Sequence, residues 1–183
     1  TSAGPVDFDF TANYTRENVK NRPALGDSQS NVGKNLMTLA GTYNQAWLKH
    51  YEDADGNYSN WNANDQYNKN PYWDLYKNGN TSKKDVFRLT GKAIWNINKH
   101  LKLQGTIGTD INSMNFEDFI AKTTPGTPAG KLTDQIFNNR TLNAELLALY
   151  NNSWGDFDVN ATAGGNIFKV NNKTTTNVGL NQQ

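Results

Sequence analysis

Residues 87–112 read FRLTGKAIWNINKHLKLQGTIGTDIN, and this stretch decides the fold class. Over 87–97 and again over 101–111, apolar residues or glycine occupy nearly every odd position, while most even positions are polar or charged. A period of two is typical of a β-strand that has one apolar face. The stretch therefore predicts two antiparallel strands joined by a short turn near 98–100.

The same alternation recurs in three further places, so the sequence predicts an all-β chain of five long strands. Within the first long connection, apolar residues at helical spacing predict a short helix over roughly 35–50, with Asn35 or Ser30 as its N-cap. The long connections are expected over about 17–84 and 113–138, and the other connections are short. The strands are expected at about 5–16, 85–97, 101–112, 140–151 and 156–169.

The length of these strands indicates a membrane barrel. Each runs about 10–12 residues, whereas strands of soluble proteins centre near 5–6 and membrane-spanning barrel strands need about 9–11. We therefore expect an antiparallel transmembrane β-barrel segment with long extracellular loops, in which Ala93 and Leu103 face lipid and Lys92 and Gln104 face the lumen. Aromatic residues at both ends of the apolar stretches resemble the interfacial girdles of such barrels: Trp95, Tyr150, Trp154 and Phe157 beside the short turns, and Phe87, Phe137 and Phe168 near the far ends.

Composition excludes several classes of protein. The 183 residues include 29 Asn and 18 Thr but no Cys, with 18 basic against 17 acidic side chains and a mean hydropathy of −0.80. So many poor helix formers argue against a helical bundle, and an aromatic share of 11% argues against disorder. The near-neutral charge gives no electrostatic basis for nucleic-acid binding, and the lack of cysteine excludes disulfides and thiol catalysis.

Several segments of the chain, in their order, resemble one known family. They are similar to segments in the barrel of SusC/RagA-type TonB-dependent outer-membrane transporters of Bacteroidetes. The similar segments are an NPYW motif where a long loop ends, an L-x-L-x-G strand and a GDFxxxAxxGG hairpin arm. The resemblance covers nearly the whole chain. The segments are NRP at 21–23, NPYW at 70–73, KKD at 83–85, WNINKHLKLQG at 95–105 and WGDFDVNATAGGN at 154–166.

This resemblance implies a function and a set of partners. Members of the family import glycans or peptides through a barrel of roughly 22 strands that encloses a plug domain. A SusD-like surface lipoprotein caps the extracellular mouth, and a TonB complex supplies energy. We expect the chain to be one stretch of a longer nutrient importer in the cell outer membrane, without the plug domain or the TonB-contacting parts. Its expected partners are the lipid bilayer, a SusD-like lipoprotein and an oligosaccharide or peptide. The alternative is a soluble β-sandwich that binds carbohydrate, because its strands would also alternate.

Motifs that would carry catalysis or hold a metal are weak. The chain has no G-x-S-x-G elbow, P-loop or dinucleotide-binding motif. Residues 53–59 resemble the start of a calcium loop, but Tyr58 and Asn64 stand where an EF-hand needs Gly and Glu. His50 and His100 have no further ligand at zinc spacing. We therefore expect no enzyme activity, no cofactor and no metal.

The first long connection carries the candidate binding residues. Between 47 and 78, Trp and Tyr are interleaved with Asn, Asp and Lys. Aromatic rings beside amides and carboxylates suit sugars, peptides or a protein interface. The other interpretation, which the sequence leaves open, is that these rings form the core of the loop itself. The candidates for substrate or partner binding are Trp47, Tyr51, Trp61, Tyr72 and Trp73.

Overall fold

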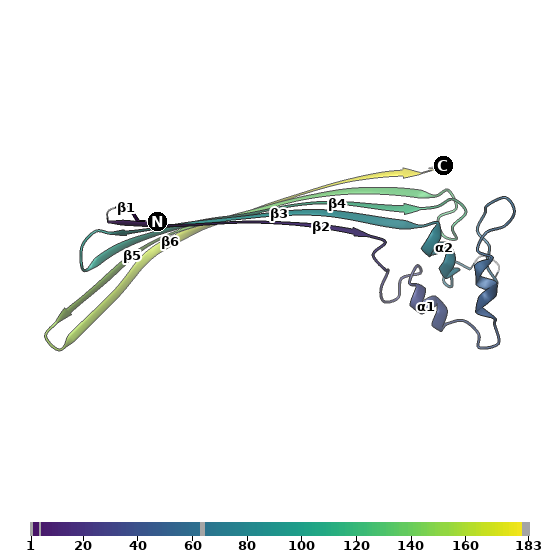
Figure 1. Ribbon diagram of the computed structural model, residues 1–183, viewed down its shortest axis with the longest axis horizontal. Coiled ribbons are helices and arrows are strands. Elements are labelled where there is room, and N and C mark those ends of the chain that lie inside the picture. Colours follow the sequence, from purple (N-terminus) through teal and green to yellow (C-terminus); the bar gives the residue numbers. More distant parts are fainter. Residues whose placement is uncertain (1, 4, 63–64, 181–183) are drawn as a thin grey trace. The chain divides into compact units, whose positions relative to one another are not determined.

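The computed structural model of the chain describes residues 2–3, 5–62 and 65–180, most of which form an antiparallel β-sheet. The strands lie side by side in the order of the chain (Figure 1). The all-β class is confirmed, and the sheet formed by the described residues is not closed. The strands are β1 Ser2–Ala3, β2 Val6–Lys20, β3 Gly79–Asn96, β4 Leu101–Ile120, β5 Lys131–Trp154 and β6 Phe157–Leu180.

Strands β2 to β6 overlap in sequence with the five ranges expected, but each strand is longer than its expected range. Most of the extra length of β2 to β5 lies next to the long connections, which run over 21–78 and 121–130 instead of 17–84 and 113–138. The extra length of β6 is missed for a physical reason. Over 171–177 the residues on both faces of β6 are polar, so the alternation disappears although the strand continues.

The single helix expected over 35–50 is wrong, because this part of the chain forms two short helical pieces. Helix α1 covers Val32–Met37, and a 3₁₀ helix, η1, covers Gln45–Lys49. Each begins at an asparagine, Asn31 or Asn44, whose side chain accepts a backbone N–H of the first turn. A second N-cap in the middle of the segment starts a new helix, so the apolar spacing does not belong to one continuous helix.

Neither expected N-cap begins a helix. Ser30 precedes the true N-cap of α1, and Asn35 lies inside α1. The sequence reasoning also missed helix α2, Pro71–Tyr76, whose N-cap Asn70 accepts the N–H of Tyr72. Proline suits the first helical position because its φ is already helical and its missing N–H would have no partner there. The NPYW segment is therefore the start of a helix.

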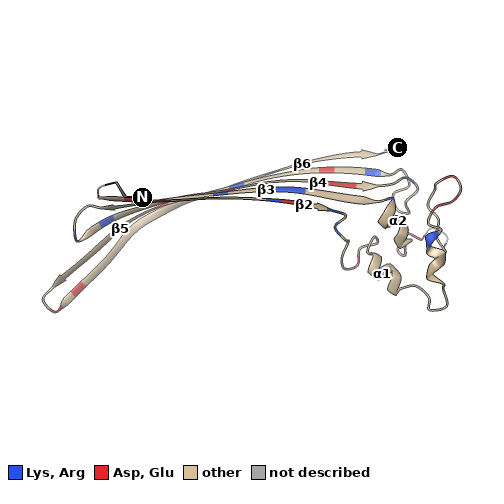
Figure 2. Ribbon diagram, in the orientation of Figure 1, with Lys and Arg blue, Asp and Glu red and all other residues tan. Residues whose placement is uncertain are grey.

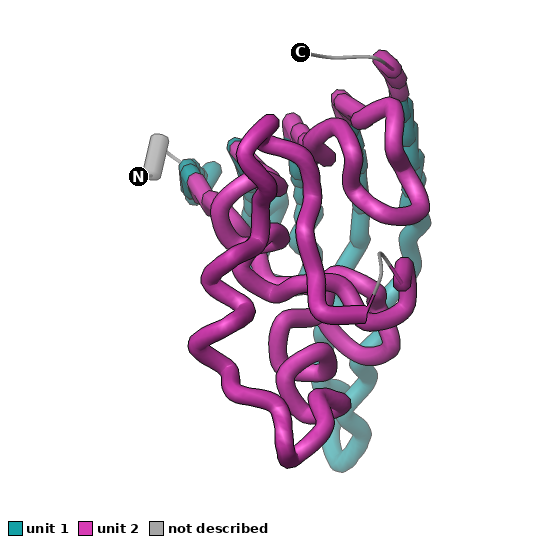
Figure 3. The backbone as a smooth tube through the Cα atoms, turned by 90° about the vertical axis from the view of Figure 1, so that its right-hand side faces the viewer, with its two compact units in different colours: residues 1–16, 84–114, 137–174 teal, residues 17–83, 115–136, 175–183 magenta. Residues whose placement is uncertain are grey.

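The chain divides into two compact units (Figure 3). Every described residue that is buried belongs to the second of them, where the hydrophobic core consists of Leu48, Tyr58 and Trp73. Helix α2 contacts both α1 and η1 in this unit. The sheet unit comprises 1–16, 84–114 and 137–174, and the loop unit comprises 17–83, 115–136 and 175–183.

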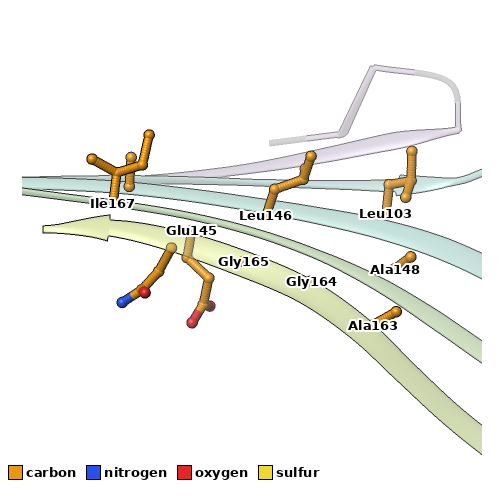
Figure 4. A pocket seen from close by; sticks show the side chains of 10 residues that line it. Leu103, Glu145, Leu146, Ala148, Ala163, Gly164, Gly165 and Ile167 are labelled. Atoms are coloured by element: carbon orange, nitrogen blue, oxygen red, sulfur yellow. The ribbon is translucent and has the colours of Figure 1, made fainter.

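The sheet unit has one apolar and one polar face. Leu146 and Ile167 project to one side of the sheet and Glu145 projects to the other (Figure 4). The apolar side chains are exposed, Leu146 by 60% and Ile167 by 59%. Strand β6 has no charged residue over 159–168 (Figure 2).

Contacts at two glycines show which residues of neighbouring strands share the apolar face. A Cβ at Gly91 would lie 3.6 Å from Ile107 Cγ2, and a Cβ at Gly105 would lie 4.0 Å from Leu146 Cδ1. Because side chains alternate along a strand, odd residues of β3 and β4 and even residues of β5 belong to this face. Ala93 and Leu103 accordingly lie on the apolar face, and Lys92 and Gln104 lie on the polar face.

Candidate functional site

The loop unit is organised around Asn70, which is completely buried. Its Nδ2 donates to the carbonyl oxygens of Leu48 at 2.9 Å and Ser59 at 3.2 Å, and its Oδ1 accepts the N–H of Tyr72 at 3.0 Å. The N–H of Asn70 donates to Tyr58 Oη at 2.6 Å. Buried backbone groups need such partners where no helix or sheet pairs them. Asn70 therefore holds η1, the segment at 58–59 and α2 together.

Trp73 joins the first long connection to the second. It is only 1% exposed, and its Nε1–H donates to Thr124 Oγ1 at 2.8 Å. Thr124 is itself completely buried, and its hydroxyl donates to the carbonyl of Ala121 at 2.7 Å. A buried indole N–H requires an acceptor, and here the acceptor comes from the other connection. Trp73 is therefore a core residue of the loop unit.

Two more hydrogen bonds fasten the second connection to the first. Thr123 Oγ1 accepts the N–H of Tyr58 at 2.8 Å, and Asn78 Oδ1 accepts the N–H of Ala121 at 2.9 Å. Thr123 has a φ of 63°, which is unusual for a β-branched residue. The surrounding bonds hold this turn in its strained conformation.

Burial raises the pKa of the Tyr58 hydroxyl to about 12. The hydroxyl therefore stays neutral at physiological pH while it accepts the N–H of Asn70. A neutral phenol inside the core avoids the desolvation of a charge. Tyr58 is thus a structural residue of the loop unit.

Tyr43, Trp47 and Trp61 form a cluster of rings, the first aromatic group. The Tyr43 ring centroid lies 5.1 Å from that of Trp47 in an edge-on arrangement and 5.2 Å from that of Trp61. Trp47 is 56% exposed and Trp61 is 39% exposed. Tyr43 is not among the predicted site residues. It lies before Asn44, the N-cap of η1, so its contact with Trp47 is not a pair within one helix. Exposed rings of this kind can stack on a sugar or fill a pocket of a protein partner.

Tyr51, Tyr72 and Tyr76 form the second aromatic group. The Tyr76 centroid lies 5.6 Å from that of Tyr51 and 6.0 Å from that of Tyr72, the latter pair being stacked. Lys77 Nζ lies 6.0 Å from the Tyr51 ring centroid and pairs with Glu52. The hydrogen bond with Glu52 raises the pKa of Lys77, so this cation stays charged beside the rings.

The structure thus distributes the five predicted site residues over two aromatic groups and the core, and the Tyr51 ring centroid lies 6.4 Å from that of Trp73. Trp47 and Trp61 meet through Tyr43, Tyr51 and Tyr72 meet through Tyr76, and Trp73 lies in the core. Some rings of the connection, Tyr58 and Trp73, form its core, and others, such as Trp47 and Trp61, are exposed. That the exposed rings bind a substrate or partner stays a prediction.

A cavity of about 370 Å³ lies in the loop unit beside α1 and α2. Burial raises the pKa of Asp74, whose Oδ1 accepts a hydrogen bond from Asn78 Nδ2 at 2.6 Å. The cavity presents guanidinium, hydroxyl, carboxyl and amide groups, a set that suits a polar ligand. Those groups belong to Arg22, Ser30, Asp74, Asn78 and Asp118.

The turn at 53–57, which resembles the start of a calcium loop, is closed by its own side chain. Asp53 Oδ1 accepts the N–H of Asn57 at 2.8 Å and that of Asp55 at 3.0 Å. These bonds lower the pKa of Asp53. In the part of the chain that the structure describes, no three His, Asp or Glu side chains gather closely enough to hold a metal ion. The two histidines lie in different units.

No protein-family model matches the chain, and no curated protein matches it. Among the described residues, no helix is both long enough and apolar enough to cross a membrane. The functional argument therefore rests on the two faces of the sheet unit and on the core and exposed rings of the loop unit.

Proposed function

We propose that the chain is a wall-and-loop segment of a TonB-dependent nutrient importer in the outer membrane. The sheet unit forms part of a transmembrane β-barrel wall, with its apolar face toward lipid and its polar face toward the lumen. The observation that carries this proposal is the apolar face, which extends over neighbouring long strands and is nevertheless exposed.

The exposure of this face favours a membrane. Phe10, Phe87, Ile107, Leu146 and Ile167 are all exposed large apolar residues of the sheet unit. Contiguous apolar patches beyond a few hundred Å² mark contacts with a membrane or a protein partner. Lipid would cover all of these side chains at once.

The width of the apolar stretch supports the same interpretation. On β3 it extends from Phe87 to Trp95, about 26 Å at 3.3 Å per residue. A strand tilted by about 40° would project this to about 20 Å, near the roughly 25 Å apolar band of outer-membrane barrels. Both end residues are aromatic, as is common at the two interfaces of a bilayer.

The polar face suits a water-filled lumen. Arg88 Nε lies 2.9 Å from Asp110 Oδ1 on this face, and Glu145 projects from it (Figure 4). The Arg88 side chain is 62% exposed and that of Asp110 44%, so both keep part of their hydration. Charges on a lipid-facing surface would lose that hydration.

The β-sandwich alternative fits the described residues less well. A sandwich packs a second sheet about 10 Å from the first, and the inner faces of the two sheets share a core. The described residues form a single sheet, and no residue of the sheet unit among them is buried. A barrel wall requires no second sheet.

The loop unit would form part of the extracellular mouth. Its core keeps the connection folded, and its exposed rings, Trp47, Trp61 and Tyr76, are then available to a glycan or peptide and to a SusD-like lipoprotein. Energy coupling through a TonB complex would act on other parts of the importer.

Cysteine labelling of intact cells that express the full-length parent protein tests this orientation. Ala129 lies exposed in the connection at 121–130, whereas Lys99 lies exposed in the short turn after β3. Ala129→Cys should react with a membrane-impermeant maleimide in intact cells, and Lys99→Cys should react only after the cells are lysed. Ala129 is preferable to the neighbouring Gly126, whose φ of 85° disfavours a side chain.

Two results would contradict the proposal. Labelling of Lys99→Cys alone in intact cells would invert the topology. A parent protein that stays monodisperse in buffer without detergent would remove the membrane wall altogether.

A further inference from the structure

A hollow of about 420 Å³ lies on the sheet unit at β5 and β6. Its lining combines two cations, Arg140 and Lys169, with the aliphatic side chain of Leu142. Both cations are exposed. Val170 and Asn171 complete the lining.

The hollow lies where the apolar face of these two strands ends. Leu146 and Ile167 are on that face (Figure 4). Arg140 and Lys169 are each an even number of residues away from them along the same strand, so they project to the same side. They are the first charged residues on this face of β5 and β6 in the direction of the connection at 121–130. The two cations therefore mark one boundary of the apolar band.

No carboxylate forms an ion pair with either cation among the described residues. The other two arginines of the sheet unit do have such partners: Arg16 Nε lies 3.8 Å from Asp85 Oδ1, and Arg88 Nε lies 2.9 Å from Asp110 Oδ1. The positive charge at the hollow is therefore available to an anion from outside the chain.

We propose that this hollow binds the phosphate headgroup of an anionic membrane lipid, in the leaflet on the side of the long connections. The planar guanidinium of Arg140 donates to two phosphate oxygens, and Lys169 adds a second positive charge. The inference rests on the proposed function, because the apolar face must lie in lipid, and it adds a preferred class of lipid and a place for it.

The aliphatic surface next to the cations favours a lipid over a free phosphate ion. From Leu142 the same face continues to Ala144 and Leu146, which line a second hollow of about 500 Å³ (Figure 4). An acyl chain that follows this surface removes apolar area from contact with polar surroundings. An inorganic anion gains nothing from it.

Native mass spectrometry of the full-length parent protein in detergent tests the proposal. The probes are phosphatidylglycerol, phosphatidylcholine with the same acyl chains, and inorganic phosphate. The protein should bind phosphatidylglycerol more tightly than phosphatidylcholine, because choline neutralises the phosphate. Inorganic phosphate should neither bind stably nor displace the lipid.

Two double variants provide the comparison. Arg140→Gln combined with Lys169→Gln should weaken phosphatidylglycerol binding roughly 25-fold, about fivefold for each cation removed. Lys92→Gln combined with Lys102→Gln removes the same charge from the polar face and should leave the affinity unchanged. Arg140→Lys, which keeps the charge but loses the planar fork, should bind with intermediate affinity.

Three results would each overturn the lipid site: equal affinity for the two lipids, equal loss in both double variants, or inorganic phosphate bound as tightly as phosphatidylglycerol. Heat-modifiable gel migration of the same preparations keeps this outcome separate from the proposed function. A protein that migrates as a folded barrel but does not discriminate between the lipids contradicts only the lipid site. A wild-type protein with neither barrel migration nor a need for detergent contradicts the proposed function instead.

Discussion

The sheet unit and the loop unit differ in whether their apolar residues are buried or exposed. In the loop unit, Leu48, Tyr58 and Trp73 are buried. In the sheet unit, Leu146 and Ile167 are as large as Leu48 but remain exposed on one face. One unit has an interior of its own, whereas the other has a surface that requires an apolar surrounding.

The two units also use asparagine differently. In the loop unit, the Asn70 side chain donates hydrogen bonds to backbone carbonyls, and the Asn78 side chain accepts one from a backbone N–H. The backbone segments that they bind form no sheet. In the sheet unit the backbone is paired by the strands, and Asn151 Nδ2 donates instead to Asn160 Oδ1 across two of them on the polar face. Asparagine side chains therefore hold an irregular loop together in one unit and give the other unit a polar, hydrated surface.

Removing Trp73 should have the largest effect, confined to the loop unit. Trp73→Ala leaves a cavity and deprives Thr124 of its donor, so the free energy of unfolding of the loop unit should fall by about 3–5 kcal/mol. Hydrogen exchange over 45–76 should accelerate, while the strands of the sheet unit keep their protection. The matched control Trp47→Ala, at an exposed position, should change stability by no more than about 0.5 kcal/mol. Equal acceleration in both variants would mean that Trp73 is not a core residue.

The next largest effect concerns the two faces of the sheet unit. Leu103→Arg or Ala93→Arg on the apolar face should reduce the yield of heat-modifiable barrel, at a cost of about 2–4 kcal/mol near the bilayer midplane. Gln104→Arg and Lys92→Arg, one position away on the polar face, should assemble normally. If the yields on the two faces were the same, the apolar face would not contact lipid.

A smaller effect is expected at two adjacent glycines of β6. A Cβ at Gly164 would lie 2.3 Å from the carbonyl oxygen of Leu146 and 2.6 Å from Leu147 Cδ2, whereas a Cβ at Gly165 meets nothing within 4 Å. Gly164→Ala should therefore destabilise the barrel by about 1–3 kcal/mol in urea unfolding, and Gly165→Ala should not. A stable Gly164→Ala variant would show that β5 and β6 can separate at this point.

The pH dependence of the loop unit should follow Asp74. Burial raises the pKa of Asp74 above its ordinary value of 3.8, so the folded state holds the proton more tightly than the unfolded state does. The resulting stabilisation is complete below 3.8 and is lost as the pH rises through the raised pKa. Hydrogen exchange of the loop unit as a function of pH should show this loss in the wild type, and Asp74→Asn should weaken it. The same pH profile in both proteins would assign the dependence to another group.

The smallest effects on stability are expected at two rings outside the core, the exposed Trp61 and the half-buried Tyr72. Trp61→Ala and Tyr72→Ala should change stability by no more than about 0.5 kcal/mol yet lower substrate uptake or capture of the lipoprotein. Tyr67→Ala is the control, because Tyr67 is exposed and belongs to neither aromatic group. Normal uptake in the first two variants together with a lower barrel yield would make these rings part of the loop packing.

From the sequence, each strand could be predicted only over the stretch in which one of its faces is apolar. Beyond that stretch, as over 171–177, the strand is held by backbone pairing that leaves no pattern in the side chains. Helix α2 left a local signal, the proline after Asn70, but the segment was interpreted as the exit of a loop.

The candidate site was predictable only in part, for a related reason. Aromatic density identified the right connection, but the spacing from Tyr43 to Trp47 could not identify the first aromatic group, because Tyr43 lies outside helix η1. Nothing local distinguishes the buried Trp73 from the exposed Trp61, because the acceptor of Trp73 is Thr124, 51 residues further along the chain.

That separation has a consequence for the order of folding. Trp73 and Thr124 are 51 residues apart, and Tyr58 and Thr123 are 65 residues apart, so each of their hydrogen bonds closes a long stretch of chain. The entropy lost on such closure delays contacts of this kind unless intervening structure has already shortened the path. Pairing of β3 with β4 shortens it, since it brings the connection at 121–130 beside the end of α2. We therefore expect the core of the loop unit to form after this hairpin, and protection of the Trp73 indole N–H against exchange to appear late in refolding.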